Sequence, residues 1–130
     1  MPFRCVVVTP EMQVLDAEAK QVILPAHDGL LGVLPGRAPI LVKLGLGPLT
    51  VDTIDGKRSI YFVDGGVAQM KGDTLTLATT EAVPSAELDV AAARAELAEA
   101  TAQRANGQIP ADVRERSVRR AEAKLALAAK

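Results

Sequence analysis

The residues of this chain that could take part in catalysis are few and lie far apart in the sequence. The chain has one histidine, His27, and one cysteine, Cys5. His27 is followed by Asp28 and Gly29, a combination typical of a turn, and general acid–base catalysis needs a partner group within hydrogen-bond reach. One histidine and one cysteine also do not supply the usual ligand sets of a zinc site. We therefore expect a surface or turn-capping role for His27, and neither a catalytic centre nor a metal site.

One glycine-containing stretch begins like a dinucleotide-binding fingerprint and then departs from it. Residues 45–50 read Gly-Leu-Gly-Pro-Leu-Thr, so that Thr50 replaces the third glycine and Pro48 interrupts the turn into a helix. A phosphate-binding Gly-x-x-x-x-Gly-Lys-Ser/Thr sequence does not occur. The sequence therefore predicts no nucleotide-dependent enzyme and no cofactor.

A basic segment near the C-terminus is the main local concentration of charge. Residues 113–130 carry a net charge of +4, although the whole chain has a net charge of only -1. A solvated basic face is the most common meaning of such a pattern, and an acidic protein partner is the more specific one. Nucleic acid ranks last, because this half of the chain has no aromatic residue for base stacking. The candidate contact residues are Arg114, Arg116, Arg119, Arg120 and Lys124.

A segment rich in glycine, proline and leucine is the candidate binding element of the N-terminal half. Glycine permits backbone angles that are strained for other residues, whereas proline fixes φ and removes a hydrogen-bond donor. We therefore expect a rigid apolar loop that contacts a partner. Its candidate contact residues are Gly29, Leu30, Leu31, Gly32, Pro35, Gly36, Arg37, Ala38 and Pro39.

The elements that must carry these residues fall into two halves with different periodicity. From Phe3 to about Val83 the sequence alternates short aliphatic runs with turn residues, which predicts many short strands in a sandwich or flattened barrel. Asp55-Gly56 and Gly72-Asp73 indicate hairpin turns, while Gly45 to Pro48 and Gly65-Gly66 are expected to interrupt strands. Because the sequence has only three aromatic residues, we expect a core of aliphatic side chains that includes Cys5.

The second half, from residue 85 to 130, is expected to form a helical hairpin. Ser85 is the expected helix cap, Ala86 to Ala105 the first helix, and Ala111 to Lys130 the second. Three-and-four spacing predicts an interhelical seam of small residues: Leu88, Ala91, Ala95, Ala98 and Ala102 on the first helix, and Val118, Ala121, Leu125 and Ala128 on the second. Small side chains bury little area, so this seam should close weakly.

Three runs of the sequence, in order, carry a resemblance to a known family. They are Gly29 to Leu41, Tyr61-Phe-Val-Asp-Gly-Gly-Val-Ala68, and Leu75-Thr-Leu-Ala-Thr-Thr-Glu-Ala82. Together they resemble the epsilon subunits of bacterial F-type rotary ATP synthases. The resemblance implies an α+β fold, with an N-terminal β-sandwich over residues 1–84 that binds the rotor and an antiparallel helical hairpin over residues 85–130 that regulates.

The resemblance also implies a function and partners. It implies a non-catalytic central-stalk subunit that links the gamma subunit to the c-ring, at the cytoplasmic face of the bacterial plasma membrane and without inserting into the bilayer. In an extended state its basic second helix would meet the alpha and beta catalytic subunits and inhibit ATP hydrolysis. The loop from Gly29 to Pro39 would contact the c-ring.

Three departures from the family pattern modify these expectations. Leu30 stands where an acidic residue is common and Arg37 where histidine is usual, so ring contact should be more apolar here. Some members bind ATP through Leu/Ile-Asp-x-x-Arg-Ala, but Asp89 and Arg94 are separated here by two extra residues. That insertion turns the arginine by about 200° around a helix. We expect weak or absent ATP binding.

An alternative function of another class fits the same pattern of elements. A free-standing ligand-binding β domain with a coiled-coil tail for self-association would also combine a sheet-rich half with two alanine-rich helices. The two hypotheses differ in the behaviour of the isolated chain, because a rotor subunit should be monomeric and should bind gamma one to one.

Overall fold

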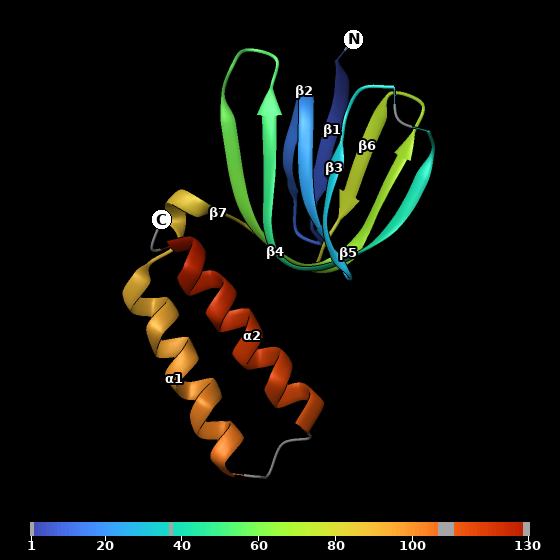
Figure 1. Cartoon of the computed structure of the whole chain (residues 1–130). Helices are drawn as coiled ribbons and strands as arrows, with labels where there is room; N and C mark the ends of the chain where they lie inside the picture. Colours follow the sequence, from blue (N-terminus) through green and yellow to red (C-terminus); the bar gives the residue numbers. More distant parts are fainter. Residues whose placement is uncertain (1, 37, 107–110, 129–130) are drawn as a thin grey trace. The chain divides into compact units, whose positions relative to one another are not determined.

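The computed structural model describes residues 2–36, 38–106 and 111–128, and within the helices it leaves out the side chains of residues 103–106, 111, 112 and 114. The chain divides into two compact units, Met1–Pro84 and Ser85–Lys130. The first is built of strands and the second of helices (Figure 1). Neither helix, in the part that is described, is long and apolar enough to cross a membrane.

The first unit is one sheet that closes on itself. Its strands are β1 (Phe3–Val8), β2 (Gln13–Ala26), β3 (Gly29–Val33), β4 (Ile40–Thr53), β5 (Arg58–Lys71), β6 (Thr74–Ala78) and β7 (Ala82–Pro84). The order is β1-β6-β5-β4-β2-β3, and β1 also pairs with β2, so that five strands form a ring. β1 and β6 are parallel, whereas the other pairs are antiparallel. The predicted flattened barrel is confirmed.

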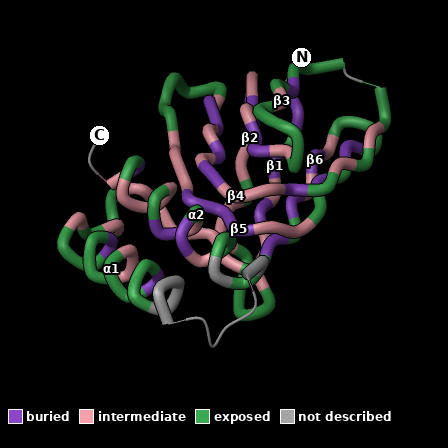
Figure 2. Tube along the Cα trace, turned by 60° about the horizontal axis from the view of Figure 1, so that its bottom comes forward, coloured by how far each residue is buried: buried purple, intermediate pink, exposed green. Residues whose placement is uncertain are grey.

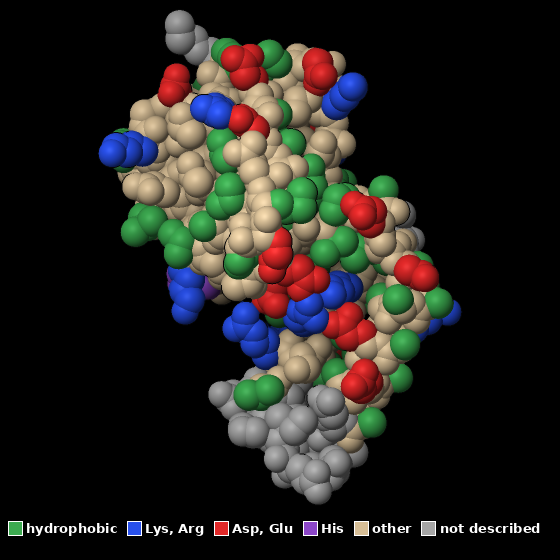
Figure 3. Space-filling model, turned by 180° about the vertical axis from the view of Figure 1, so that it is seen from behind, with side chains coloured by type: hydrophobic (Ala, Val, Ile, Leu, Met, Phe, Trp, Pro, Cys, Tyr) green, Lys and Arg blue, Asp and Glu red, His purple; other side chains and the backbone are tan. Residues whose placement is uncertain are grey.

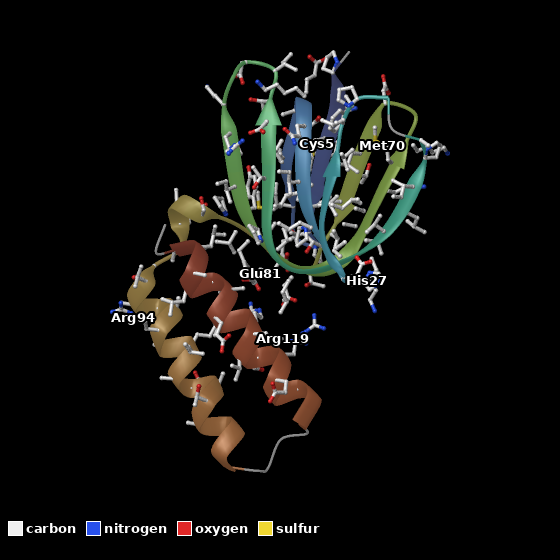
Figure 4. The ribbon with its side chains drawn as sticks, in the orientation of Figure 1. Cys5, His27, Met70, Glu81, Arg94 and Arg119 are labelled. Atoms are coloured by element: carbon white, nitrogen blue, oxygen red, sulfur yellow. The ribbon has the colours of Figure 1, made fainter. Side chains whose placement is uncertain are left out.

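The core of the ring is aliphatic, as the composition predicts. On β1 the side chains of Phe3, Cys5 and Val7 are buried and the residues between them are not, which is the two-residue alternation of a strand with one face inward. Leu75 and Leu77 follow the same alternation on β6. Figure 2 shows buried positions along the strands and exposed ones at the turns. Cys5 and Met70 both point into this interior (Figure 4).

Two predicted hairpin turns are confirmed, and two predicted interruptions are wrong. Gly56 and Gly72 have φ of 86° and 62° in the β4–β5 and β5–β6 turns. In contrast, residues 45–48 and 65–66 lie inside β4 and β5, whose register runs without a shift from the pair Ile40–Met70 to the pair Asp52–Arg58. The glycines there do not end the strands, because the positive φ of Gly47, Gly65 and Gly66 lets a long strand bend and remain hydrogen-bonded.

Gly66 is the tightest of these bends. Its φ is 113°, and a Cβ added there would lie 2.0 Å from the carbonyl oxygen of Ala78 and 2.8 Å from the Cα of Thr79. Both neighbours are backbone atoms, one in the last residue of β6 and one in the residue after it, so they cannot rotate away as a side chain could. The position therefore requires glycine for two separate reasons, conformation and space.

The second unit consists of a 3₁₀ turn, η1 (Ser85–Glu87), and the helices α1 (Val90–Asn106) and α2 (Ala111–Ala128). The predicted start of the first helix is wrong by four residues. Ser85 belongs to the 3₁₀ turn, in which its carbonyl accepts the N–H of Leu88 at 3.2 Å. Asp89 caps α1 instead, since its carboxylate accepts the N–H of Ala91 at 2.8 Å.

We predict that Gly66→Ala destabilises the strand unit by more than about 2 kcal/mol, because it combines backbone strain with a backbone clash. The matched control is Gly32→Ala, at a position where an added Cβ meets no atom within 4 Å and φ is not in the left-handed region. Urea unfolding of both variants measures the difference. Equal unfolding midpoints for the two variants would contradict the analysis.

We also predict that the Cys5 thiol does not react in the folded protein. Burial, with a smaller effect from the charge of Asp16, raises the pKa of Cys5 to about 12, so the reactive thiolate is almost absent at neutral pH. Alkylation by iodoacetamide should therefore proceed only as fast as the strand unit opens, and should accelerate in urea. A variant carrying an added cysteine at the exposed position Ala98 gives the rate of an accessible thiol. Labelling of Cys5 at that rate in buffer would refute the prediction.

Candidate functional site

The segment expected to be a loop is half strand. Gly29–Val33 forms β3, which pairs with β2 from Val22 opposite Val33 to Ala26 opposite Gly29. The expectation of a loop over these residues is wrong, because leucines between the glycines give an extended segment that the end of β2 can pair with. The turn proper comes afterwards, where Pro35, Gly36, Ala38 and Pro39 are exposed. Arg37 lies outside the described residues.

Three leucines, in β3, directly after β3 and near the start of β4, are exposed. Leu30 is 66% exposed, Leu34 57% and Leu41 71%, which are unusual values for leucine. Leu31, their neighbour on β3, instead packs against the core. We call the set Leu30, Leu34 and Leu41 the apolar end.

Two members of the apolar end, Leu30 and Leu41, line a pocket of about 440 Å³. It is formed by the β2–β3 turn and the first residues of β4, which the hydrogen bond from the His27 N–H to the Lys43 carbonyl (3.0 Å) holds together. His27 is exposed on this turn and its side chain points away from the sheet interior (Figure 4). The lining residues are Ala26 to Leu31 and Ile40 to Lys43. Its largely aliphatic walls suit an apolar side chain of a partner better than a charged ligand.

The apolar surface continues along the outer face of two neighbouring strands. Leu41 of β4 lies opposite Gln69 of β5, and Lys43 lies opposite Val67, which is 44% exposed. These four side chains are all exposed and so lie on the outer face of the sheet. Figure 3 shows exposed hydrophobic side chains among scattered charged ones on the surface of this unit.

The five predicted cations of the second helix have different environments. Arg116 and Arg119 are exposed, and the side chain of Arg114 lies outside the described part. Arg120 and Lys124 are partly buried, and both form ion pairs with one carboxylate of α1, that of Glu96. Acidic and basic side chains lie next to one another on the helices (Figure 3). The cations therefore do not form one solvated face.

The predicted seam is wrong on the first helix. Ala91, Ala95, Ala98 and Ala102 are exposed, whereas Ala93 and Ala100 are buried, which places the inner side of α1 on nearly the opposite face. Alanine occurs all around α1, so its spacing fits several faces equally well. On α2 the prediction agrees with the structure, since Val118 and Ala121 are buried and Leu125 and Ala128 are partly buried.

Glu96 is the residue of the hairpin that sequence reasoning missed. It lies between Ala93 and Ala100 on the buried side of α1, and its carboxylate is 32% exposed. Its position three residues after one buried alanine and four before the other is a signal that could have found it. That signal becomes readable only when the correct face of the helix is known.

The two residues of the altered ATP motif, Asp89 and Arg94, do not form a binding site together in this structure. Asp89 is the cap of α1, and its carboxylate is occupied with the backbone of Ala91. Arg94 is exposed and projects from α1 on the side away from α2 (Figure 4). No hydrogen bond or ion pair joins these two described residues. Within the described part of the chain, no group of three His, Cys, Asp or Glu side chains could hold a metal ion.

Comparison with known proteins defines the class of this fold. The family model "ATP synthase, Delta/Epsilon chain, beta-sandwich domain" matches residues 2–85, which is the whole strand unit. The chain is also similar to the F1 and c-ring structure of the Euglena gracilis mitochondrial ATP synthase, with a TM-score of 0.75 and 25% identity over 95% of this chain and 75% of that one. A central-stalk chain of Tetrahymena thermophila, 14% identical with a TM-score of 0.56, shares the fold. The strand unit is therefore an ATP synthase delta/epsilon sandwich.

Two curated relatives are both of one subunit type within this class. The ATP synthase epsilon chain of Rhodopirellula baltica is 45% identical over 96% of this chain and 97% of its own length. The epsilon chain of Myxococcus xanthus is 36% identical over 94% of this chain and 91% of its own length. The protein belongs to the ATP synthase epsilon chain family. Membership confirms the predicted resemblance and the prediction of a non-catalytic subunit.

Proposed function

We propose that this chain is the central-stalk subunit that links gamma to the c-ring during proton-driven ATP synthesis, and that its helices inhibit ATP hydrolysis. The observation that carries the proposal is the apolar end, because a free monomer gains nothing from exposing three large leucines, two of which line one pocket. A stiff closed barrel beside such a surface suits a part that transmits torque. The site of action is the cytoplasmic face of the bacterial plasma membrane.

The apolar end, with the turn at Pro35 to Pro39, is the surface that we assign to the c-ring. Leu30 replaces the acidic residue common at this position, so contact here depends on burial of leucine more than on charge pairing. The outer face around Leu41 and Val67 continues from this end along β4 and β5. We assign the part of that face around Val67 to gamma, because it adjoins the apolar end without belonging to it.

The second helix is the surface that we assign to the catalytic alpha and beta subunits in an extended, inhibitory state. Its excess of positive charge would complement an acidic segment there. Arg116 and Arg119 are exposed even in the closed hairpin. Arg114, Arg120 and Lys124 complete the proposed contact set.

We infer that ATP does not regulate this hairpin by direct binding. The carboxylate of Asp89 caps a helix, and Arg94 projects from α1 away from α2. Both groups would have to be rearranged to converge on one nucleotide.

Leu34→Asp should weaken attachment of the full chain to an ATP synthase that lacks epsilon by at least about tenfold, because a leucine buried in the contact contributes ~1.5–3 kcal/mol. Co-sedimentation of the tagged chain with the complex measures this affinity. Ile54→Asp is the control, since Ile54 is 52% exposed and follows the other end of β4. If both variants attached equally well, the apolar end would not be the ring contact.

Replacing Arg114, Arg116, Arg119, Arg120 and Lys124 together by Ala should raise ATP hydrolysis of the reconstituted complex by about threefold or more. Each lost charge pair is worth ~0.2–1 kcal/mol, so five lost pairs weaken the inhibitory state measurably. Arg94→Ala removes one exposed cation from α1 and should leave hydrolysis unchanged. Unaltered inhibition in the fivefold variant would reject the inhibitory role.

A further inference from the structure

Two of the proposed inhibitory cations pair with one carboxylate of α1, that of Glu96. Its Oε1 accepts a hydrogen bond from the Arg120 Nη1, and its Oε2 lies 3.5 Å from the Lys124 Nζ. Arg120 and Lys124 are four residues apart and so lie on one face of α2. The two oxygens thus hold two cations of the opposite helix at once.

These ion pairs are better shielded than ordinary surface pairs. The exposed fractions of the side chains are 32% for Glu96, 27% for Arg120 and 14% for Lys124. Partial burial strengthens a charge-assisted hydrogen bond and raises the penalty for leaving one partner without the other. Without Glu96, two cations would stand close together at the interhelical surface with the countercharge on α1 removed.

The rest of the seam holds the helices together only weakly. Among the described side chains of α1, Ala93 and Ala100 are the buried ones, and each contributes little apolar area. The described buried residues of α2 are Val118, Ala121 and Leu127, so that two branched aliphatic side chains and three alanines are buried in the hairpin. A pair of ion pairs is therefore a substantial part of what keeps the hairpin closed.

We propose that Glu96 is a latch: an internal acidic ligand that competes with the acidic surface of the catalytic subunits for Arg120 and Lys124. This inference rests on the proposed function of the second helix. The cations cannot bind the Glu96 carboxylate and a partner carboxylate at the same time. Closure of the hairpin therefore withdraws two of the five inhibitory cations, and engagement of the partner opens the latch by the same free energy.

The latch is tested first in the full chain alone. Spin labels on cysteines placed at the exposed positions Ala98 and Ala126 report the distance between α1 and α2, while the buried Cys5 remains unlabelled. Glu96→Gln should raise the population with separated helices about three- to tenfold, as expected for the loss of two partly shielded ion pairs. Added sodium chloride should separate the helices of the native chain and have little effect on Glu96→Gln.

Glu99→Gln is the matched control, because Glu99 is an exposed acid on the same helix and the substitution changes the charge equally. It should leave the distance distribution as in the native chain. The swap of Glu96→Lys with Arg120→Glu should restore closure, which guards against a trivial loss of the helices. Identical distributions for Glu96→Gln and Glu99→Gln, or a swap that stays open, would overturn the latch.

Hydrolysis by the reconstituted complex separates the latch from the proposed function. Glu96→Gln should deepen inhibition, whereas Glu99→Gln should not. If the helices separate in the free chain but hydrolysis responds neither to Glu96→Gln nor to the fivefold cation variant, the latch stands and the inhibitory role fails. If the cation variant relieves inhibition and Glu96→Gln leaves the distances unchanged, the inhibitory role stands and the latch fails.

Discussion

The close approach of Gly66 to the backbone at Ala78 and Thr79 is the constraint on which the strand unit depends. It lets β5 bend while β4 and β6 stay hydrogen-bonded on either side, and the bend allows the five strands to close into a ring. A closed ring has no free edge among its members, so β3 can remain at the side of β2 as a short strand devoted to contact. The exposed leucines of the apolar end are held by a scaffold that does not need them for stability.

The two units differ in what stabilises them. The strand unit buries a continuous cluster of aliphatic side chains whose members lie far apart in the sequence. The described part of the hairpin buries three alanines, Val118 and Leu127, and its closure depends in part on ion pairs to Glu96. Ion pairs weaken with salt and can be exchanged for equivalent pairs with a partner, whereas a packed aliphatic core cannot be exchanged. The strand unit, which we expect to keep its contacts, is held by the aliphatic core. The proposed switch in the hairpin depends on the exchangeable ion pairs.

The sequence alone predicts the class of fold correctly. It predicts less well where each strand or helix ends and which face of a helix is buried. Asp55-Gly56 and Gly72-Asp73 predicted their hairpins correctly, because a tight turn is determined by the residues within it. Gly45 to Pro48 and Gly65-Gly66 were misjudged as ends of strands, because whether a glycine ends or bends a strand depends on what lies across from it. Ser85 is the predicted cap, whereas Asp89 caps α1 in the structure; both residue types cap helices well, so residue type alone does not identify the cap. The prediction of the buried face of α1 is wrong because alanine occurs all around that helix. Without the correct face, Glu96 could not be recognised as a residue that faces α2.

The parallel pairing of β1 with β6 has a consequence for how the polypeptide acquires its shape. Residues 4–8 of β1 pair with residues 74–78 of β6. One edge of β1 therefore stays without its hydrogen-bond partner until β6 has been synthesised. Contacts so distant along the sequence slow folding, because most of the intervening segment must be ordered before they are made. On the ribosome, β1 would therefore leave the exit tunnel long before its neighbour, with only β2 to shield it. The helices, whose partners are near in sequence, could form as soon as they emerge.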